Sequence, residues 1–123
     1  MLLDTHLLLW SLFDTARISE PAASLMKDAS TSAIVSVVNF WEIAIKRSTG
    51  KLSAPDDLPD LILELGHEIM LINPNHAWIA GALPLHHRDP FDRLLIAQAQ
   101  VENLPILTHD RMFEQYDVLV IRA

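Results

Sequence analysis

The chain has 123 residues, a formal net charge of −7, no cysteine, and a hydrophobic residue at half of its positions. This length and apolar content suit one domain over residues 1–123, and the lack of cysteine excludes disulfides and cysteine zinc sites. No apolar run has the length of a membrane span and no basic signal-peptide start is present, so we expect a cytoplasmic protein without a membrane segment. The acidic charge argues against nucleic-acid binding. Bound cations would offset it, as would a local patch of Lys46, Arg47, Lys51, Arg88 and Arg93.

Short apolar strands alternate with helices along the chain. In chain order we expect a strand at 1–4, a helix at 5–14, a helix at 20–29, a strand at 33–36, helices at 37–48 and 55–66, a strand at 68–72, helices at 74–83 and 89–103, a strand at 104–108, a helical turn at 110–115 and a strand at 118–121. Ser19 and Asp89 suit helix N-caps, and Gly50 suits a helix stop.

The strands are apolar without alternation, as expected when both faces of a strand are buried. They therefore predict an α/β fold in which helices cover both faces of a parallel sheet. Functional residues of such sheets lie beyond the carboxyl ends of the strands.

Acidic residues occur at these strand ends. Asp4 directly follows the first strand, and Asp110 follows the fourth. Glu42 lies two turns into the helix after the second strand, and Asp89 and Asp92 begin the helix before the fourth. Because parallel strands end at the same edge of a sheet, we expect these carboxylates to share one cleft.

Each carboxylate also has a purely structural explanation. Asp4, Asp89 and Asp110 suit helix caps, and Glu42 precedes Lys46 by four residues, as in a helical salt bridge. The helix around Glu42, however, is apolar nearly all round. This predicts a buried carboxylate that needs a stronger partner than one lysine.

Several carboxylates in one cleft would require cations, because two such charges about 4 Å apart repel by ~4 kcal/mol at an effective dielectric of 20. Carboxylates without cysteine suit Mg²⁺ or Mn²⁺. Such an ion activates water and stabilises the charge on a phosphodiester during hydrolysis, so no side-chain nucleophile is needed. The acidic set therefore indicates a metal-dependent nuclease.

Four segments together resemble the signature segments of PIN domains, in the expected order and over nearly the whole chain. They are Leu3-Asp4-Thr5-His6, Trp41-Glu42-Ile43-Ala44-Ile45-Lys46, His87-Arg88-Asp89-Pro90-Phe91-Asp92-Arg93-Leu94-Leu95-Ile96-Ala97 and Leu107-Thr108-His109-Asp110. The chain is similar to the VapC toxins, in particular to a subgroup that carries the His-x-Asp-Pro-Phe-Asp-Arg segment.

The resemblance implies a three-layer α/β/α PIN-like fold with a five-stranded parallel sheet. It implies an endoribonuclease that uses Mg²⁺ or Mn²⁺, with catalytic and metal-binding residues at Asp4, Glu42, Asp92 and Asp110. The implied partners are an RNA substrate, a second copy of the chain in a homodimer, and a small VapB-like antitoxin that covers the site.

Further residues match positions around this site. Asp89 is an additional candidate for metal binding, or serves only as a helix cap. Thr5 and Thr108 match hydroxyl positions that would orient carboxylates or water. Lys46 and Arg93 are candidates for contact with phosphate, and an exposed salt bridge is the alternative for both.

Other residues are given structural interpretations. We expect an exposed loop at His86 and His87, with a substrate contact as the alternative. We leave His109 outside the site, with an approach to the phosphate as the alternative, because it precedes Asp110. We expect core or interface packing for the three tryptophans, Trp10, Trp41 and Trp78. The apolar face around Leu61 and Leu65 is expected to pack in the core, with docking of an antitoxin helix as the alternative.

A phosphoacceptor receiver domain also carries acids at strand ends. It needs paired acids after the first strand, an acceptor aspartate after the third and a lysine after the fifth, whereas here Asp4 stands alone, Asn73 follows the third strand and Arg122 the fifth. Two alternatives within the PIN resemblance remain open. One is a non-catalytic module that binds RNA or protein, and the other is a DNA-directed nuclease.

Overall fold

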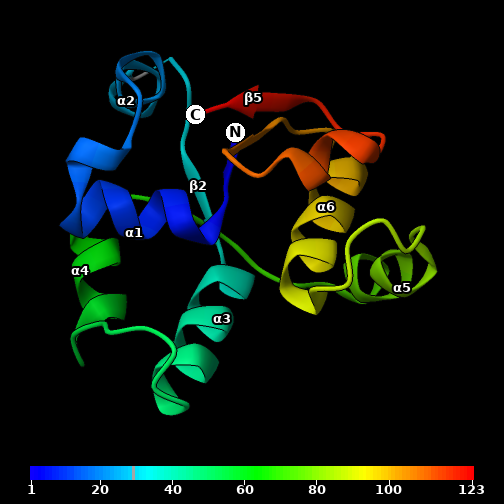
Figure 1. The fold of residues 1–123 in the computed structure, drawn as a ribbon, viewed down its shortest axis with the longest axis horizontal. Coiled ribbons are helices and arrows are strands. Elements are labelled where there is room, and N and C mark those ends of the chain that lie inside the picture. The colour runs from blue at the N-terminus through cyan, green and yellow to red at the C-terminus, as the bar shows by residue number, and fades with distance from the viewer. Residues whose placement is uncertain (29) are drawn as a thin grey trace.

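Five short strands form one parallel sheet. In the computed structural model, which describes residues 1–28 and 30–123, the strands are β1 (Leu2–Leu3), β2 (Ile34–Ser36), β3 (Glu68–Met70), β4 (Ile106–Thr108) and β5 (Val120–Arg122). Their order in the sheet is β3-β2-β1-β4-β5, and every pairing between them is parallel. The predicted five-stranded parallel sheet is confirmed, with β1 at its centre. Figure 1 shows the helices around the sheet, whose strands β2 and β5 are labelled.

Helices connect the strands. The α-helices are α1 (Thr5–Phe13), α2 (Glu20–Lys27), α3 (Val37–Ser48), α4 (Leu58–Glu64), α5 (Pro74–Ala82) and α6 (Pro90–Glu102), and the 3₁₀ turns are η1 (Thr15–Arg17) and η2 (Arg111–Gln115). Side-chain caps fix two of the predicted helix starts. Ser19 accepts a hydrogen bond from the Ala22 amide, and Asp89 accepts from the amides of Phe91 and Asp92.

Two helices differ from the expected ranges. The helix expected at 55–66 begins only at Leu58, after a turn in which the Leu58 amide donates to the Pro55 carbonyl at 3.2 Å. The helix expected at 20–29 ends at Lys27, and residue 29 lies outside the described residues. The turn η1 was not predicted.

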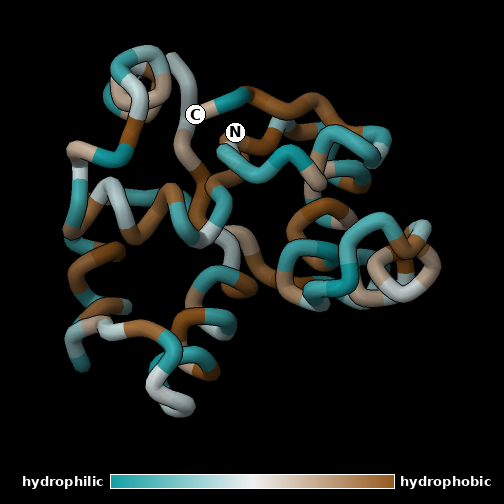
Figure 2. Tube along the Cα trace, viewed as in Figure 1, coloured by the Kyte–Doolittle hydropathy of each residue, from teal (hydrophilic) through white to brown (hydrophobic). Residues whose placement is uncertain are grey.

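Two hydrophobic clusters cover the two faces of the sheet, because successive strand residues point to opposite sides. On one face Leu2, Ile34 and Ile106 pack with α6 and the residue after α5. On the other face Leu3, Val35 and Leu107 pack with α1, α2 and α4. This is the predicted three-layer α/β/α arrangement, and Figure 2 shows the hydrophobic stretches that run along the strands.

Several large apolar side chains remain at the surface. Trp41 is 49% exposed and Trp78 is 83% exposed, so core packing is wrong for both and interface packing stays a prediction, whereas Trp10 is half-buried. Leu65 is exposed as well, which contradicts the expected core packing at that position. No helix within the described residues has the length and apolar character needed to cross a membrane.

Candidate metal centre

The carboxyl ends of β1 and β4 meet at the middle of the sheet. The strand order reverses its direction there, which is where α/β sheets place their sites. The register of Leu3 with Leu107 brings Asp4 beside Thr108. The Thr108 hydroxyl donates to Asp4 Oδ2 at 2.6 Å and accepts from the amide of Asp110 at 3.0 Å. These contacts hold Asp4 and Asp110 at the same edge of the sheet. The hydrogen bond from Thr108 fixes the position of the Asp4 carboxylate.

Asp4 favours its negative form although its side chain is only 3% exposed. Burial acts to raise the pKa of Asp4, but hydrogen bonds from His6 and Thr108 outweigh burial and hold that pKa below its usual value. One of these bonds comes from the His6 amide, which donates to Asp4 Oδ1 at 3.2 Å at the start of α1. Asp4 is therefore a carboxylate at neutral pH.

Asp92, in the first turn of α6, shows the opposite behaviour. Burial is the largest cause, and the negative charges of Asp4, Asp89, Glu42 and Asp110 add to it, so that the pKa of Asp92 is raised to about 9. The other four carboxylates expected at the site therefore all act on Asp92. They come from four separate segments of the chain.

Glu42 is buried on α3, as expected, and only one of its carboxylate oxygens is paired. Lys46 Nζ pairs with Glu42 Oε2 and lies 3.8 Å from Asp89 Oδ2, so Lys46 links α3 to α6. Glu42 Oε1 is buried and has no hydrogen-bond partner in the part of the chain that the structure describes. Such an oxygen is unfavourable unless a cation or a donor compensates its charge.

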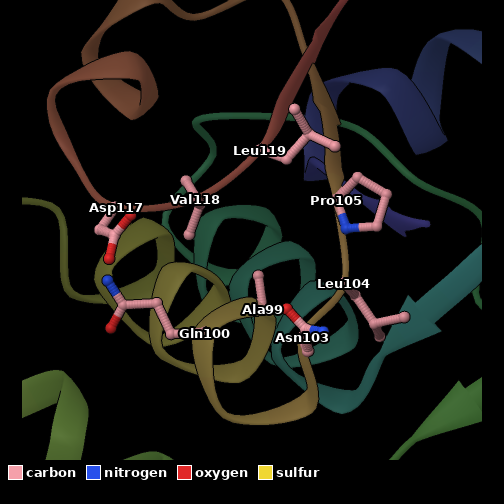
Figure 3. Close-up of a pocket in the computed structure, with 8 residues that line it drawn as sticks. All are labelled: Ala99, Gln100, Asn103, Leu104, Pro105, Asp117, Val118 and Leu119. Carbon is pink, nitrogen blue, oxygen red and sulfur yellow. The ribbon is translucent and has the colours of Figure 1, made fainter.

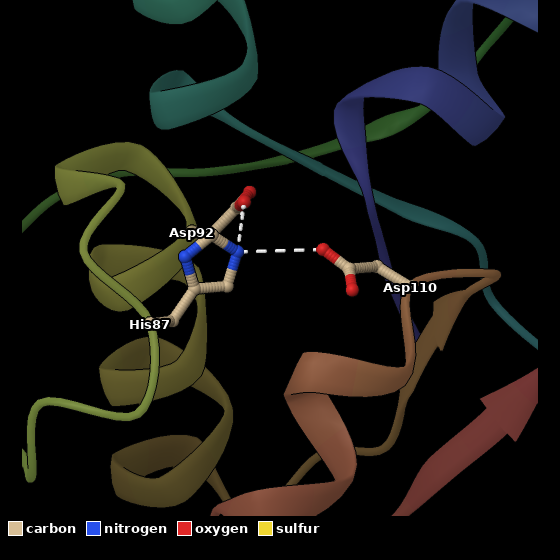
Figure 4. Close-up of side chains that lie close together, drawn as sticks. All are labelled: His87, Asp92 and Asp110. Atoms are coloured by element: carbon tan, nitrogen blue, oxygen red, sulfur yellow. Dashed lines mark ion pairs between the residues drawn. The ribbon is translucent and has the colours of Figure 1, made fainter.

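The structure adds a histidine that the sequence did not assign to the site. His87 Nε2 lies 2.8 Å from Asp92 Oδ2 and 3.3 Å from Asp110 Oδ2 (Figure 4). The ligand atoms of these three residues all lie within 4.8 Å of one another. The expectation of an exposed loop is therefore wrong for His87, while His86 is exposed as expected.

His87 faces the two carboxylates with the nitrogen that carries its proton. The amide of Asp89 donates to His87 Nδ1 at 3.2 Å, so a neutral ring has its hydrogen on Nε2. Nε2 lies close to Asp92 and Asp110, but the geometry does not meet the criteria for a hydrogen bond to either carboxylate. His87 Nε2 is thus placed both to hold the two carboxylates near each other and to offer a ligand atom to an ion beside Asp92 and Asp110.

The residues present fit a divalent cation. Carboxylate oxygens are the ligands that Mg²⁺ and Mn²⁺ prefer, and both the unpaired Glu42 oxygen and the raised pKa of Asp92 indicate uncompensated negative charge. Asp4, Glu42, Asp92 and Asp110 are the residues that could hold the ion. Asp89 lies at the border of the group, because its Oδ1 is already used to cap α6.

Arg93 has a structural role. It is buried, and its two terminal nitrogens donate to the carbonyl oxygens of Ala80, Leu83, Pro84 and His87 at 2.8–3.2 Å. Because these carbonyls take up both nitrogens, the phosphate contact and the exposed salt bridge expected for Arg93 are both wrong. Arg93 instead fixes the segment that carries His87 onto α6.

The family of the chain follows from a comparison with protein-family models. The model of the PIN domain matches residues 1–119, which include every residue expected at the site. The chain belongs to the PIN-domain family. Its acidic cluster therefore lies in a family of proteins that are generally nucleases. A comparison with curated proteins gives no significant match.

Solved structures share the fold of this PIN domain over nearly its whole length. A chain of the VapBC2 structure from Rickettsia felis, bound to a DNA fragment from its promoter, has a TM-score of 0.74 at 13% identity and covers 99% of this chain and 97% of its own. FitAcB from Neisseria gonorrhoeae gives 0.71 at 20% identity, with coverages of 98% and 96%. A toxin–antitoxin complex from Klebsiella pneumoniae gives 0.66 at 16% identity, with coverages of 98% and 94%. At these identities the likeness establishes the fold alone.

Buried polar residues beneath the PIN-domain site were not predicted. Asn39 Nδ2 donates to Thr5 Oγ1 at 2.9 Å and to the Leu3 carbonyl at 3.1 Å, and Ser36 Oγ donates to Gln98 Oε1 at 2.6 Å. Thr5 thus has Asn39 as its partner, and its role towards a carboxylate or water stays a prediction. A lone polar residue within an apolar run was the available signal for both Asn39 and Gln98.

A pocket of about 590 Å³ lies at the amino ends of β4 and β5, opposite the ends that carry the carboxylate cluster (Figure 3). Its lining residues are Ala99, Gln100, Asn103, Leu104, Pro105, Asp117, Val118 and Leu119. They lie at the end of α6 and before β4 and β5, hence at the amino ends of these strands. Asp117 is the single acidic residue among them, so this pocket offers no second carboxylate cluster.

Proposed function

We propose that this PIN domain is a Mg²⁺- or Mn²⁺-dependent endoribonuclease that hydrolyses RNA phosphodiester bonds, and that it is the toxin of a VapBC-type toxin–antitoxin pair. The observation that carries the proposal is the buried position of Asp92 among four other carboxylates: burial and then their negative charges raise the pKa of Asp92 to about 9. A cluster with this much negative charge favours a divalent cation.

A divalent cation at Asp4, Glu42, Asp92 and Asp110 would activate water and stabilise the negative charge of the phosphodiester. The chain itself orients the carboxylates around it. Thr108 holds Asp4 by a hydrogen bond of 2.6 Å. Lys46 pairs with Glu42 and remains partly exposed, so its positive charge lies where a phosphate would approach.

The toxin assignment draws on the fold. Chains of similar fold occur in the VapBC2 structure from Rickettsia felis and in a toxin–antitoxin complex from Klebsiella pneumoniae. A small VapB-like antitoxin, a homodimeric assembly and a cytoplasmic location belong to the same proposal. Exposed apolar residues on α3, α4 and α5 offer surface for protein partners.

The test is cleavage of total bacterial RNA by the purified, antitoxin-free protein, with the ends of the products mapped. We expect discrete cuts with Mg²⁺ or Mn²⁺, no cuts with EDTA, and no cuts by Asp4→Asn. Asp56→Asn is the matched control, because Asp56 is an exposed carboxylate that pairs with Arg47 and is not among the groups that act on Asp92.

A folded wild-type protein that leaves all RNA intact with either metal would contradict the proposal. Cleavage of DNA in the same assay would indicate a DNA-directed nuclease. RNA that is bound but not cut would indicate a binding module.

A further inference from the structure

A cluster of planar side chains borders the metal centre. Trp10 of α1 lies at its middle, with the His109 ring 4.7 Å away and the His6 ring 6.1 Å away, measured between ring centroids. The rings of His6 and His109 are 5.9 Å apart. The guanidinium of Arg17 lies over the Trp10 ring, 4.8 Å from its centroid. We call these four residues the planar strip.

The planar strip is continuous with the carboxylate cluster. His6 Nδ1 lies 3.8 Å from Asp4 Oδ1, and His109 is the residue directly before Asp110. A chain molecule that reaches the carboxylates from this side must therefore pass over the strip.

Packing of the core explains Trp10, which is half-buried and contacts the hydrophobic cluster of α1, α2 and α4. It does not explain the other three members. His6, His109 and Arg17 are exposed, yet their planes gather around one indole. Among the described residues Arg17 has one loose surface pair, with Asp14 at 3.9 Å between two exposed side chains, so its charge remains available.

These properties match those of sites for single-stranded nucleic acid. Such sites combine positive charge, which follows the phosphate backbone, with planar groups on which successive bases stack. Imidazole rings and the guanidinium plane both serve as stacking surfaces, and they reach only unpaired bases, because a duplex buries the faces of its bases. In a chain of net charge −7, a cationic group beside an acidic centre marks where a polyanion can approach.

We propose that the planar strip of His6, Trp10, Arg17 and His109 binds an unpaired stretch of RNA next to the cleavage site, with bases stacked on the imidazole and guanidinium planes. This inference rests on the proposed ribonuclease function. It adds a base-stacking subsite next to the cleavage site: the protein holds the strand through its bases as well as its phosphates.

The test measures the affinity of the antitoxin-free protein for a fluorescently labelled oligoribonucleotide by anisotropy, with Ca²⁺ in place of Mg²⁺. Three probes share one length: a single strand, the same strand with abasic sites, and a duplex. The variants are His109→Ala, His109→Phe and Arg17→Gln, all at exposed positions that should not disturb the fold. Trp78→Ala and Lys51→Gln are the controls, since one is an exposed ring on α5 and the other an exposed cation beyond the end of α3.

We expect His109→Ala to weaken binding of the single strand by about fivefold or more and to leave the abasic strand unaffected, because the loss concerns stacking. His109→Phe should keep the wild-type affinity, since phenylalanine supplies a ring without imidazole chemistry. Arg17→Gln should weaken both strands and reduce the salt dependence by about one ion. The duplex should bind most weakly, and both controls should match the wild type.

Wild-type affinity in both His109→Ala and Arg17→Gln would overturn the proposal, as would equal binding of the abasic and base-containing strands or no binding of the wild type at all. Unchanged RNA affinity together with weaker binding of an antitoxin peptide would overturn it and indicate a protein interface. The assays distinguish failure of this inference from failure of the nuclease proposal. If the wild type cuts RNA while the strip variants bind it normally, only the stacking inference is wrong. If the wild type cuts no RNA while the variants lose base-dependent binding, only the nuclease proposal is wrong.

Discussion

Asp4 and Asp92 belong to the same cluster, and their surroundings move their pKa values in opposite directions. Burial favours the neutral form of both carboxyl groups. Asp4 overcomes it through hydrogen bonds from His6 and Thr108, whereas Asp92 faces further negative charges and has its pKa raised to about 9. In the absence of a cation, one group therefore stays ionised while the other keeps its proton at neutral pH.

This contrast predicts a pH-dependent stability that a single substitution removes. Between pH 4 and pH 9 the folded protein keeps the proton of Asp92 and the unfolded chain has released it, so the free energy of unfolding of the metal-free protein falls as the pH rises through that range. Asp92→Asn should remove this dependence and raise the Tm at pH 8 by on the order of 5 °C in EDTA, with little change at pH 4. Thermal melts at both pH values measure it. A lower Tm for Asp92→Asn at pH 8 would show that the Asp92 carboxyl group does not destabilise the folded protein at that pH.

Thr108 is the donor that keeps Asp4 in place. Thr108→Val has a similar shape without the hydroxyl, so it removes the 2.6 Å bond to Asp4 and the acceptor for the Asp110 amide. We expect the affinity for Mn²⁺ to fall about tenfold or more, and the free energy of unfolding to fall by about 2 kcal/mol. Isothermal titration and urea denaturation measure the two effects. Thr108→Ser keeps the hydroxyl and should restore most of both, and equal behaviour of Val and Ser would argue against the orienting contact.

At the scale of elements, the segment between α5 and α6 positions the site although it has no regular structure. Arg93 on α6 donates to four carbonyl oxygens at the end of α5 and in this segment, and His87 and Asp89 lie between them and α6. A guanidinium can satisfy several carbonyls at once because its donors form a rigid, planar fork. The side chain that the sequence suggested for phosphate contact is thus the support of the loop.

Arg93→Ala should therefore behave as a folding defect. It leaves several carbonyl groups without their donors, and we expect the free energy of unfolding to fall by about 3 kcal/mol or more, as measured by urea denaturation. Arg93→Lys should recover only part, because an ammonium cannot reproduce the fork. Arg122→Ala, in an exposed pair with Glu114, is the control and should change stability by less than about 1 kcal/mol. A stable Arg93→Ala protein would refute the supporting role.

The sequence predicted the elements better than it predicted contacts between them. The helix starts at Ser19 and Asp89 were predictable because capping is local. The start of α4 was not, because residues 55–57 form a turn where the sequence pattern also allowed a first helical turn. His87 was missed because nothing within its own segment indicates that Asp110 approaches it from the far end of the chain.

At the scale of the whole molecule, the protein presents three chemically different surfaces: the acidic cluster, the planar strip and the exposed apolar residues of the helices. The cluster suits cations, the strip suits an unpaired strand, and Trp41, Leu65 and Trp78 suit protein partners.

The toxin assignment predicts an effect in cells. Induced expression of the chain alone in a bacterial host should arrest growth, because RNA is cut, and Asp4→Asn should be tolerated at the same protein level. Growth curves and viable counts, with the amount of protein checked by immunoblot, measure this. Normal growth with abundant, folded wild-type protein would argue against a toxin, whereas arrest by both proteins would indicate an effect other than nuclease activity.

The central claim is that carboxylates from four segments form one cation site, and Mn²⁺ binding, followed by electron paramagnetic resonance, tests it most directly. We predict that the wild-type protein binds Mn²⁺, that Asp4→Asn, Glu42→Gln, Asp92→Asn and Asp110→Asn each weaken binding about tenfold or more, and that Asp56→Asn binds as the wild type does. A folded wild-type protein that does not bind Mn²⁺, or binding that all four substitutions leave unchanged, would contradict it.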